Sequence, residues 1–169
     1  MSAAILRVAP ASRRLSRGRP AHALRTAQEA IMVEASVNWT DGERFVGAAS
    51  SGHALVVDSD RQRNTGAGPM ELVLIGLCAC TATDVVSILR KKREPFTSVE
   101  VRAQAERAQE PPTVYETIHL IYRVGGKVSR KAIEDAVRLS KDKYCSVSAM
   151  LQKTAKITSE IEYAEAQQG

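Results

Sequence analysis

The chain has 169 residues, a length that suits one domain with a hydrophobic core of its own. Its net charge of +5 comes from residues 1–31, which hold six arginines and one acid, while the rest of the chain carries 18 basic and 18 acidic groups. This balance gives no electrostatic reason to expect a nucleic acid or an anionic membrane as a partner.

The chain has three cysteines, Cys78, Cys80 and Cys145. An odd number argues against a structural disulfide framework and for a reducing compartment, where thiols react or pack. No two of them have the CxxC spacing, and the three histidines are scattered along the sequence. We therefore expect no metal cofactor.

Residues 1–31 are rich in alanine, arginine and serine and nearly free of acids. This composition is typical of a mitochondrial transit peptide, and it also fits an extension from an upstream start codon with Met32 as the working start. In both cases we expect a disordered leader. The upstream start, which we favour, implies a cytoplasmic protein, and the transit peptide implies the mitochondrial matrix.

Short strands are expected directly after this leader. Alternating runs at 33–39, 44–49 and 53–58 are separated by short glycine-containing turns, a pattern typical of an antiparallel meander. A polar loop at 60–68, which contains Arg61 and Arg63, then leads to the next element.

The stretch at 69–93 predicts a long helix. Pro69 at its first position, Glu71 in its first turn and four basic residues at 90–93 match the polarity of a helix dipole. Residues 72–89 are apolar or small apart from Asp84, and this carboxyl group argues against a membrane span. A helix that is apolar on all faces must be buried on all sides. A chain this short can hardly cover such a helix alone, so we expect a partner subunit.

Two longer strands, at 98–107 and 113–124, follow the helix. Ser129 then stands where it can cap an amphipathic helix that continues to about residue 144, and a short helix at 146–153 and a last strand at 157–163 are expected after it. Strands in hairpins with helices between them indicate an α+β fold rather than a parallel α/β fold.

Cys80 is a better candidate for a reactive thiol than Cys78. The two face opposite sides of the helix, and Cys80 shares its face with Asp84, whereas Cys78 lies among apolar residues. Cys145 falls where the next helix is expected to begin, so the helix dipole and free N–H groups are expected to lower its pKa. Cys80 and Cys145 are therefore candidates to meet in space.

Two motifs carry a resemblance to a known family: Gly68-Pro69-Met70-Glu71-Leu72 followed by Cys80, and Cys145-Ser146-Val147-Ser148. On these motifs and on the order of strands and helices, residues 33–163 resemble the OsmC/Ohr family of organic-hydroperoxide reductases and osmotically induced proteins, in particular its YhfA-like branch. The resemblance implies antiparallel sheets wrapped around the long helix in an intertwined homodimer. It also implies an OsmC-like domain at 32–165 and a C-terminal tail at 166–169.

The resemblance further implies a peroxidase chemistry used in defence against oxidative stress. By position, Cys80 matches the cysteine that attacks an organic hydroperoxide, releasing an alcohol and leaving a sulfenic acid. Cys145 matches the cysteine that then closes a disulfide, which an external dithiol or lipoyl reductant reopens. This chemistry needs no metal or organic cofactor.

Several residues are candidates for the partner of the Cys80 thiolate. Peroxidases of the family have a glutamate directly after the proline, where this chain has Met70, and Glu71 lies one position further round the helix. Arg61 and Arg63 both fall near the loop position of an arginine in the family.

Asp84 is the remaining candidate, because it lies one helical turn after Cys80. We favour a structural or arginine-pairing role for this carboxylate over that of a catalytic base. The alternative to a peroxidase is a non-catalytic or weakly catalytic dimer that binds a small apolar molecule and senses redox state through its cysteines.

Overall fold

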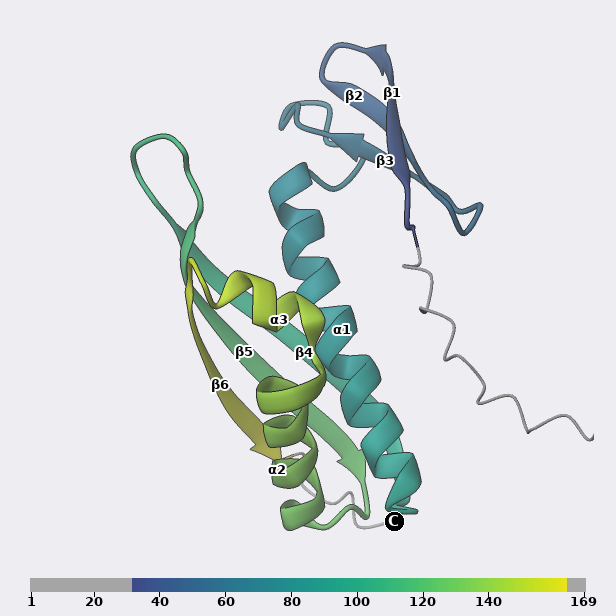
Figure 1. Ribbon diagram of the computed structural model, residues 1–169, viewed down its shortest axis with the longest axis vertical. Helices are drawn as coiled ribbons and strands as arrows, with labels where there is room; N and C mark the ends of the chain where they lie inside the picture. Colours follow the sequence, from purple (N-terminus) through teal and green to yellow (C-terminus); the bar gives the residue numbers. More distant parts are fainter. Residues whose placement is uncertain (1–31, 164–169) are drawn as a thin grey trace, which may run out of the picture. The chain divides into compact units, whose positions relative to one another are not determined.

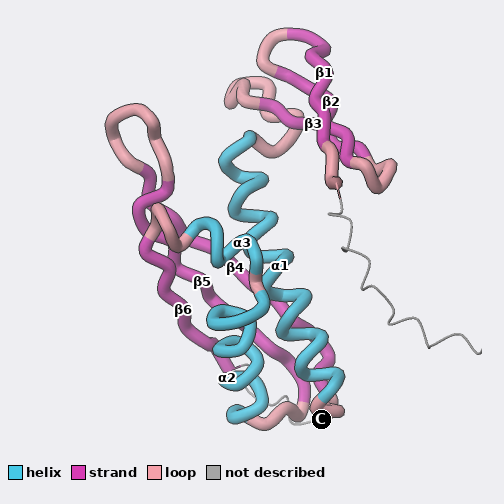
Figure 2. Tube along the Cα trace, in the orientation of Figure 1, coloured by secondary structure: helices cyan, strands magenta, loops and turns pink. Residues whose placement is uncertain are grey.

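A computed structural model describes residues 32–163 of the chain, and the expected leader at 1–31 and tail at 166–169 lie outside these residues. Figures 1 and 2 show a long helix with sheets and two shorter helices, which confirms the α+β prediction. In chain order the elements are β1 (Ala35–Asp41), β2 (Arg44–Ala49), β3 (Ala54–Asp58), α1 (Pro69–Lys91), β4 (Phe96–Arg107), β5 (Tyr115–Gly126), α2 (Arg130–Leu139), the π-helical turn η1 (Ser140–Tyr144), α3 (Ser146–Leu151) and β6 (Lys156–Tyr163).

The first sheet is the expected antiparallel meander, with the strand order β1-β2-β3. Gly42 has φ +51° in the turn between β1 and β2, and its carbonyl accepts a hydrogen bond of 2.9 Å from the indole N–H of Trp39. After β3, the Asp58 carboxylate accepts hydrogen bonds from the N–H groups of Asp60 and Thr65 at 2.9 and 3.1 Å. These bonds shape the polar loop that leads to α1.

The second sheet has the order β4-β5-β6 and departs from the expected antiparallel pattern at one strand. β4 and β5 form a long antiparallel pair, but β6 runs parallel to β5. The chain crosses from the end of β5 through α2, η1 and α3 before it re-enters the sheet, and a helical crossover of this kind joins parallel strands.

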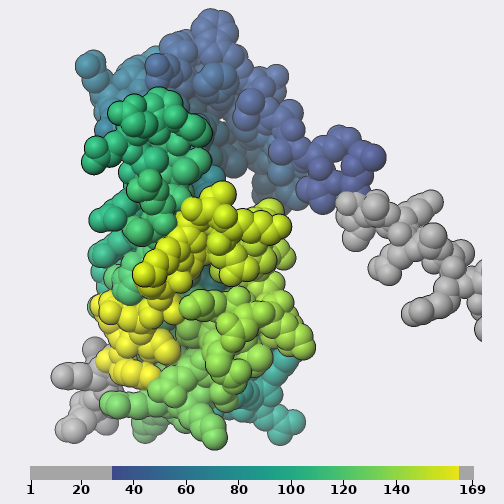
Figure 3. Space-filling view, turned by 60° about the vertical axis from the view of Figure 1, so that its left-hand side comes forward, coloured from purple at the N-terminus to yellow at the C-terminus, as the bar shows by residue number. Residues whose placement is uncertain are grey.

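A single core lies between this sheet and the helices, and Figure 1 shows α1 and α2 beside each other against the strands. α1 contributes the buried Leu77, Val85 and Leu89, and β5 contributes Ile118 and Tyr122. In the view of Figure 3, the green and yellow segments from α2 to β6 cover much of the lower half of the molecule. Most of the core side chains are aliphatic, and Tyr115 and Tyr122 are its buried aromatic residues among those described.

The start of α2 agrees with the sequence, and its end does not. The Ser129 hydroxyl accepts a hydrogen bond of 3.1 Å from the N–H of Ala132, so the predicted cap is confirmed. The α-helical turns end at Leu139, and residues 140–144 form the wider π-helical turn η1 instead of continuing α2. This turn determines where the following cysteine lies.

One face of α1 has no cover within residues 32–163. Only Leu77, Thr81, Val85, Ile88 and Leu89 are buried, and the side chain of Ile75 is 55% exposed. By length and composition α1 could span a membrane, a test that the core helix of a water-soluble protein also passes. The prediction that this apolar helix is buried on all sides is therefore not met by a single chain.

Candidate active site

The structure brings Cys80, Asp84 and Cys145 together, with their sulfur and carboxylate oxygen atoms all within 4.8 Å of one another. Cys80 and Asp84 lie one turn apart on α1, and Cys145 comes from the junction between η1 and α3. Cys80 and Asp84 are half-buried, while Cys145 is only 3% exposed. All three cysteines of the chain are free thiols.

The π-helical turn places the Cys145 thiol in this cluster. The N–H of Cys145 donates to the carbonyl of Ser140 at 2.9 Å, five residues earlier, which closes the wide turn. Cys145 then caps α3, and its sulfur accepts a hydrogen bond of 3.3 Å from the N–H of Ser148. The Cys-Ser-Val-Ser motif is thus a helix start in which a sulfur atom takes the place of the usual capping oxygen.

The pKa of Cys145 is raised to about 11, mainly because burial disfavours the charged thiolate. The N–H of Ser148 lowers the pKa, whereas the nearby Cys80 and Asp84 raise it. The prediction of a lowered pKa at a helix start is therefore wrong. α3 has only six residues, and a short helix with one N–H bond cannot offset the desolvation of a sulfur that is 3% exposed.

Three buried hydroxyl groups form a chain of hydrogen bonds that ends at the Asp84 carboxylate. The Ser140 hydroxyl donates to Oδ2 of Asp84 at 2.8 Å, the Thr81 hydroxyl lies 2.8 Å from that of Ser140, and the Tyr122 hydroxyl lies 2.7 Å from that of Thr81. Because Ser140 donates its proton to the carboxylate, it must accept from Thr81, and Thr81 must accept from Tyr122. Burial is also the main reason why the pKa of Tyr122 is raised to about 12.

These three hydroxyl groups were not predicted from the sequence. Thr81 and Asp84 share one face of α1, a signal present in the spacing. Ser140 follows the last turn of α2, and Tyr122 has the parity of the buried side of β5. No local pattern links three segments that are 41 and 59 residues apart.

The other three candidate partners of the Cys80 thiolate, Arg61, Arg63 and Glu71, do not contact it within the part of the chain that the structure describes. Arg63 forms an exposed ion pair with Asp41 at 3.0 Å, which raises the pKa of the guanidinium and lowers that of the carboxyl group. Glu71 accepts a hydrogen bond of 2.7 Å from the N–H of Gly68 and so caps α1. Arg61 is exposed and, with Glu71, lines a polar pocket of about 510 Å³.

Within residues 32–163, no ion pair or hydrogen bond brings Arg61, Arg63 or Glu71 to the two thiols. Of the four candidate partners, only Asp84 is in the cluster. Its carboxylate has no basic partner among the described residues, because no ion pair there includes it.

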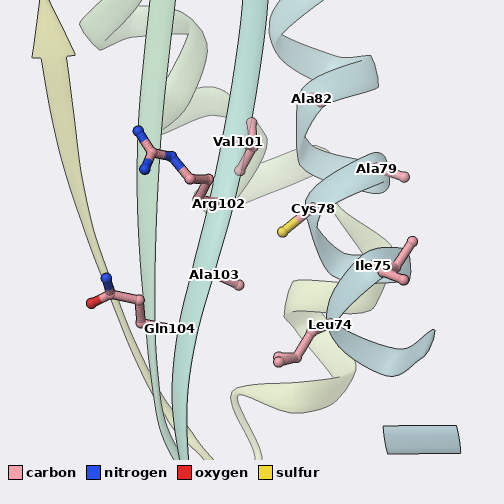
Figure 4. A pocket seen from close by; sticks show the side chains of 9 residues that line it. All are labelled: Leu74, Ile75, Cys78, Ala79, Ala82, Val101, Arg102, Ala103 and Gln104. Carbon is pink, nitrogen blue, oxygen red and sulfur yellow. The ribbon is translucent and has the colours of Figure 1, made fainter. Parts of the chain in front are cut away.

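Cys78 lies on another face of α1, as predicted. It lines an apolar groove of about 590 Å³ between α1 and β4, and burial raises the pKa of its thiol. Figure 4 shows Leu74 and Cys78 pointing from the helix toward β4, while Ile75 and Ala79 point away from that strand.

The chain is similar to known proteins in sequence and in fold. The family model described as "OsmC-like protein" matches residues 62–160. Protein YhfA of Escherichia coli strain K12 is 38% identical over 135 residues, which cover 79% of this chain and 100% of that protein.

Solved structures show the same fold. A hypothetical protein from Aquifex aeolicus is 33% identical with a TM-score of 0.70, and the match covers 80% of this chain and 100% of that one. An organic hydroperoxide resistance protein from Elizabethkingia anophelis has a TM-score of 0.62 at 14% identity, with coverage of 81% and 99%. At that identity the likeness concerns the fold alone.

Proposed function

Because the chain belongs to the OsmC-like protein family, we propose that it is a thiol-dependent reductase of organic hydroperoxides, with Cys80 as the attacking thiol and Cys145 as the resolving one. The observation that carries the proposal is the meeting of these two thiols from separate segments in one cluster. Structural neighbours named organic hydroperoxide resistance proteins share the fold of this chain.

The first step uses the Cys80 sulfur. Its thiolate attacks one oxygen of the hydroperoxide, the O–O bond breaks, and the other oxygen leaves with its electron pair and takes a proton to become an alcohol. Cys80 is left as a sulfenic acid, oxidised by two electrons. Cys80 suits this role better than Cys145 because it is more accessible to a substrate, whereas the buried Cys145 has its pKa raised to about 11.

Cys145 then resolves the sulfenic acid. Its sulfur attacks the Cys80 sulfur, water leaves, and a disulfide forms. An external dithiol or a reduced lipoyl group reopens the disulfide by two thiol–disulfide exchanges and becomes oxidised in turn. Since a disulfide needs about 2.0 Å between its sulfur atoms, the two sulfurs, now within 4.8 Å, must approach each other. The junction between η1 and α3 is the place where a small movement of Cys145 brings this about.

A homodimer is part of this proposal. The face of α1 that carries the exposed Ile75 is apolar, and only 28% of the most hydrophobic window of the helix is buried within the chain. A second copy of the chain would remove this surface from water, which is the main favourable term in association. With free thiols and no cofactor, we place the reaction in a reducing compartment, the cytoplasm or, for an imported protein, the mitochondrial matrix.

The test is consumption of cumene hydroperoxide with dithiothreitol or a dihydrolipoyl compound as reductant. We expect Cys80→Ser to lose turnover and Cys78→Ser, the matched control two residues away, to keep it. Cys145→Ser should react once and then accumulate a sulfenic acid on Cys80, visible by trapping and mass spectrometry. Turnover by the unmodified chain no faster than that of Cys80→Ser would refute the proposal.

A second candidate function rests on the apolar groove beside Cys78. Most of the side chains from α1 and β4 that line it are small or aliphatic, with Arg102 and Gln104 as the polar exceptions, which suits a small, mainly apolar molecule. For a binding protein with redox-sensing thiols, native mass spectrometry of freshly purified protein should show a bound small molecule, and Cys80→Ser should leave binding intact. Protein that carries no such molecule would count against this function.

A further inference from the structure

We propose that the reduced forms of Cys80 and Cys145, together with Asp84, bind one Zn²⁺ ion. Their sulfur and oxygen atoms lie within 4.8 Å of one another before any ion is bound. The inference needs only the two reduced thiols and the carboxylate, so it holds or fails independently of the hydroperoxide reaction.

The distances suit a tetrahedral ion. Zinc binds thiolate sulfur at about 2.3 Å and carboxylate oxygen at about 2.0–2.2 Å, so neighbouring ligand atoms end up about 3.5–3.8 Å apart. The three atoms here need to approach one another by at most about 1.3 Å to reach that spacing. Three protein ligands leave the fourth position for water or another small ligand.

The donor set selects the metal. Two thiolates favour soft or borderline ions, which excludes Mg²⁺ and Ca²⁺, since these take oxygen ligands. Cu(I) also favours thiolates, but the third donor here is a carboxylate, a ligand that Zn²⁺ accepts readily. Zn²⁺ is therefore the ion that best matches all three groups.

Hydrogen bonds from neighbouring groups hold two of the proposed ligands, Asp84 and Cys145, in place. Ser140 donates to Oδ2 of Asp84 at 2.8 Å, and Ser140 is itself fixed by Thr81 and Tyr122, all three of which are at most 1% exposed. Such hydrogen bonds to ligating carboxylates orient them toward a metal. The N–H of Ser148 fixes the Cys145 sulfur in the same way.

Charge points to a cation as well. Two thiols and a carboxyl group meet in this cluster, of which only Cys145 is fully buried, and in the described part of the chain no lysine or arginine pairs with the Asp84 carboxylate. Two thiolates and a carboxylate cannot ionise side by side without a positive charge. A divalent ion would supply that charge and release the two thiol protons to the solvent.

Bound zinc would keep the thiols reduced and block them. The Cys80 sulfur would donate an electron pair to the metal instead of attacking a peroxide, and closing a Cys80–Cys145 disulfide would require the ion to leave. Zinc binding should therefore compete with alkylation and with hydroperoxide turnover at the same sulfur atoms.

The experiment uses the full chain, reduced and freed of metal. Zn²⁺ affinity is measured by competition with a chromophoric chelator, and Co²⁺ is added as a spectroscopic probe. We expect one ion per chain and a thiolate-to-cobalt charge-transfer band. Cys80→Ser, Cys145→Ser and Asp84→Asn each remove a ligand and should weaken binding more than Ser140→Ala, which removes a hydrogen bond to a ligand and should weaken binding about 10- to 100-fold, and the control Cys78→Ser should not change it.

Three results would overturn the inference: a Cys78→Ser affinity as low as that of Cys80→Ser, cobalt binding without a thiolate band, or wild-type protein that binds no zinc. Iodoacetamide footprinting of the unmodified chain gives a check that needs no variant, because Zn²⁺ should protect Cys80 and Cys145 but leave Cys78 reactive. Turnover assays on the same samples separate the two proposals. Protein that binds zinc but shows no turnover when it is metal-free would refute only the reductase, and turnover unchanged at a free zinc concentration that saturates the protein would refute the metal site.

Discussion

Replacing Ser140 by alanine tests whether the buried hydroxyl chain holds the site together. The Ser140 side chain is completely buried and makes two hydrogen bonds of 2.8 Å, to Asp84 and Thr81. The substitution leaves one carboxylate oxygen without a donor and one hydroxyl group without an acceptor. Losing a bond to a charged group costs about 1.5–3 kcal/mol, and a neutral one about 0.5–1.5 kcal/mol.

We therefore expect Ser140→Ala to lower the free energy of unfolding by about 2–4 kcal/mol. For a domain of this size, each kcal/mol corresponds to a fall in Tm of about 3–5 °C. Urea unfolding followed by circular dichroism measures the change, at one fixed protein concentration because an associating protein gains stability with concentration.

Ser87→Ala is the matched control, since Ser87 lies on α1 but is exposed. It should change stability by less than about 0.5 kcal/mol. A double-mutant cycle with Asp84→Asn should show a coupling of at least about 1 kcal/mol, because Ser140 and Asp84 are in direct contact. If Ser140→Ala unfolds within 0.5 kcal/mol of the unmodified chain, about the scatter of neutral surface changes, the hydroxyl chain is not a structural support of the site.

Three further predictions concern a glycine, the exposed helix face and pH. Gly126→Ala should destabilise the fold by at least about 1–3 kcal/mol in urea unfolding, because φ is +110° and the new methyl group would lie 2.5 Å from the carbonyl oxygen of Pro95; an unchanged midpoint would contradict this. Ile75→Glu should convert the proposed dimer to a folded monomer by light scattering, and a persisting dimer would refute the assignment of this face. Folding raises the pKa of Cys145 to about 11, so its contribution to stability is present below the pKa of the unfolded thiol, about 9, and is lost as pH rises toward 11. The unfolding free energy should fall over that interval, and less so in Cys145→Ser.

Periodicity predicted most of the fold because each element buries one face. The strands and α1 were found within one or two residues, since alternation and the Pro69 start are local signals. The direction of β6 was not predicted, because alternation identifies a strand without identifying its neighbour. The end of α2 was missed for a related reason: residues 140–144 are helical in composition, and only the tertiary contacts of Ser140 show why the turn widens there.

The sequence identified individual residues of the site but not the groups that surround them. Cys80 and Cys145 could be chosen from helix geometry and the family motifs, but the surroundings of Cys145 could not. Its neighbours come from distant segments, so the burial that raises its pKa is invisible in the sequence. Arg63 was a reasonable candidate by position, yet Asp41 on β1 attracts it instead.

The Asp84 carboxylate should have opposite effects in the two proposals, favouring zinc binding and opposing the thiol chemistry. Zinc binding needs its carboxylate as a ligand, whereas in metal-free protein the same negative charge opposes ionisation of Cys145. Asp84→Asn should therefore weaken zinc binding, while in chelator-treated protein it should speed the alkylation of Cys145 and the closure of the disulfide. Stopped-flow alkylation with peptide mass spectrometry, run beside the chelator competition, measures both directions, and a parallel loss in the two assays would refute this dual role.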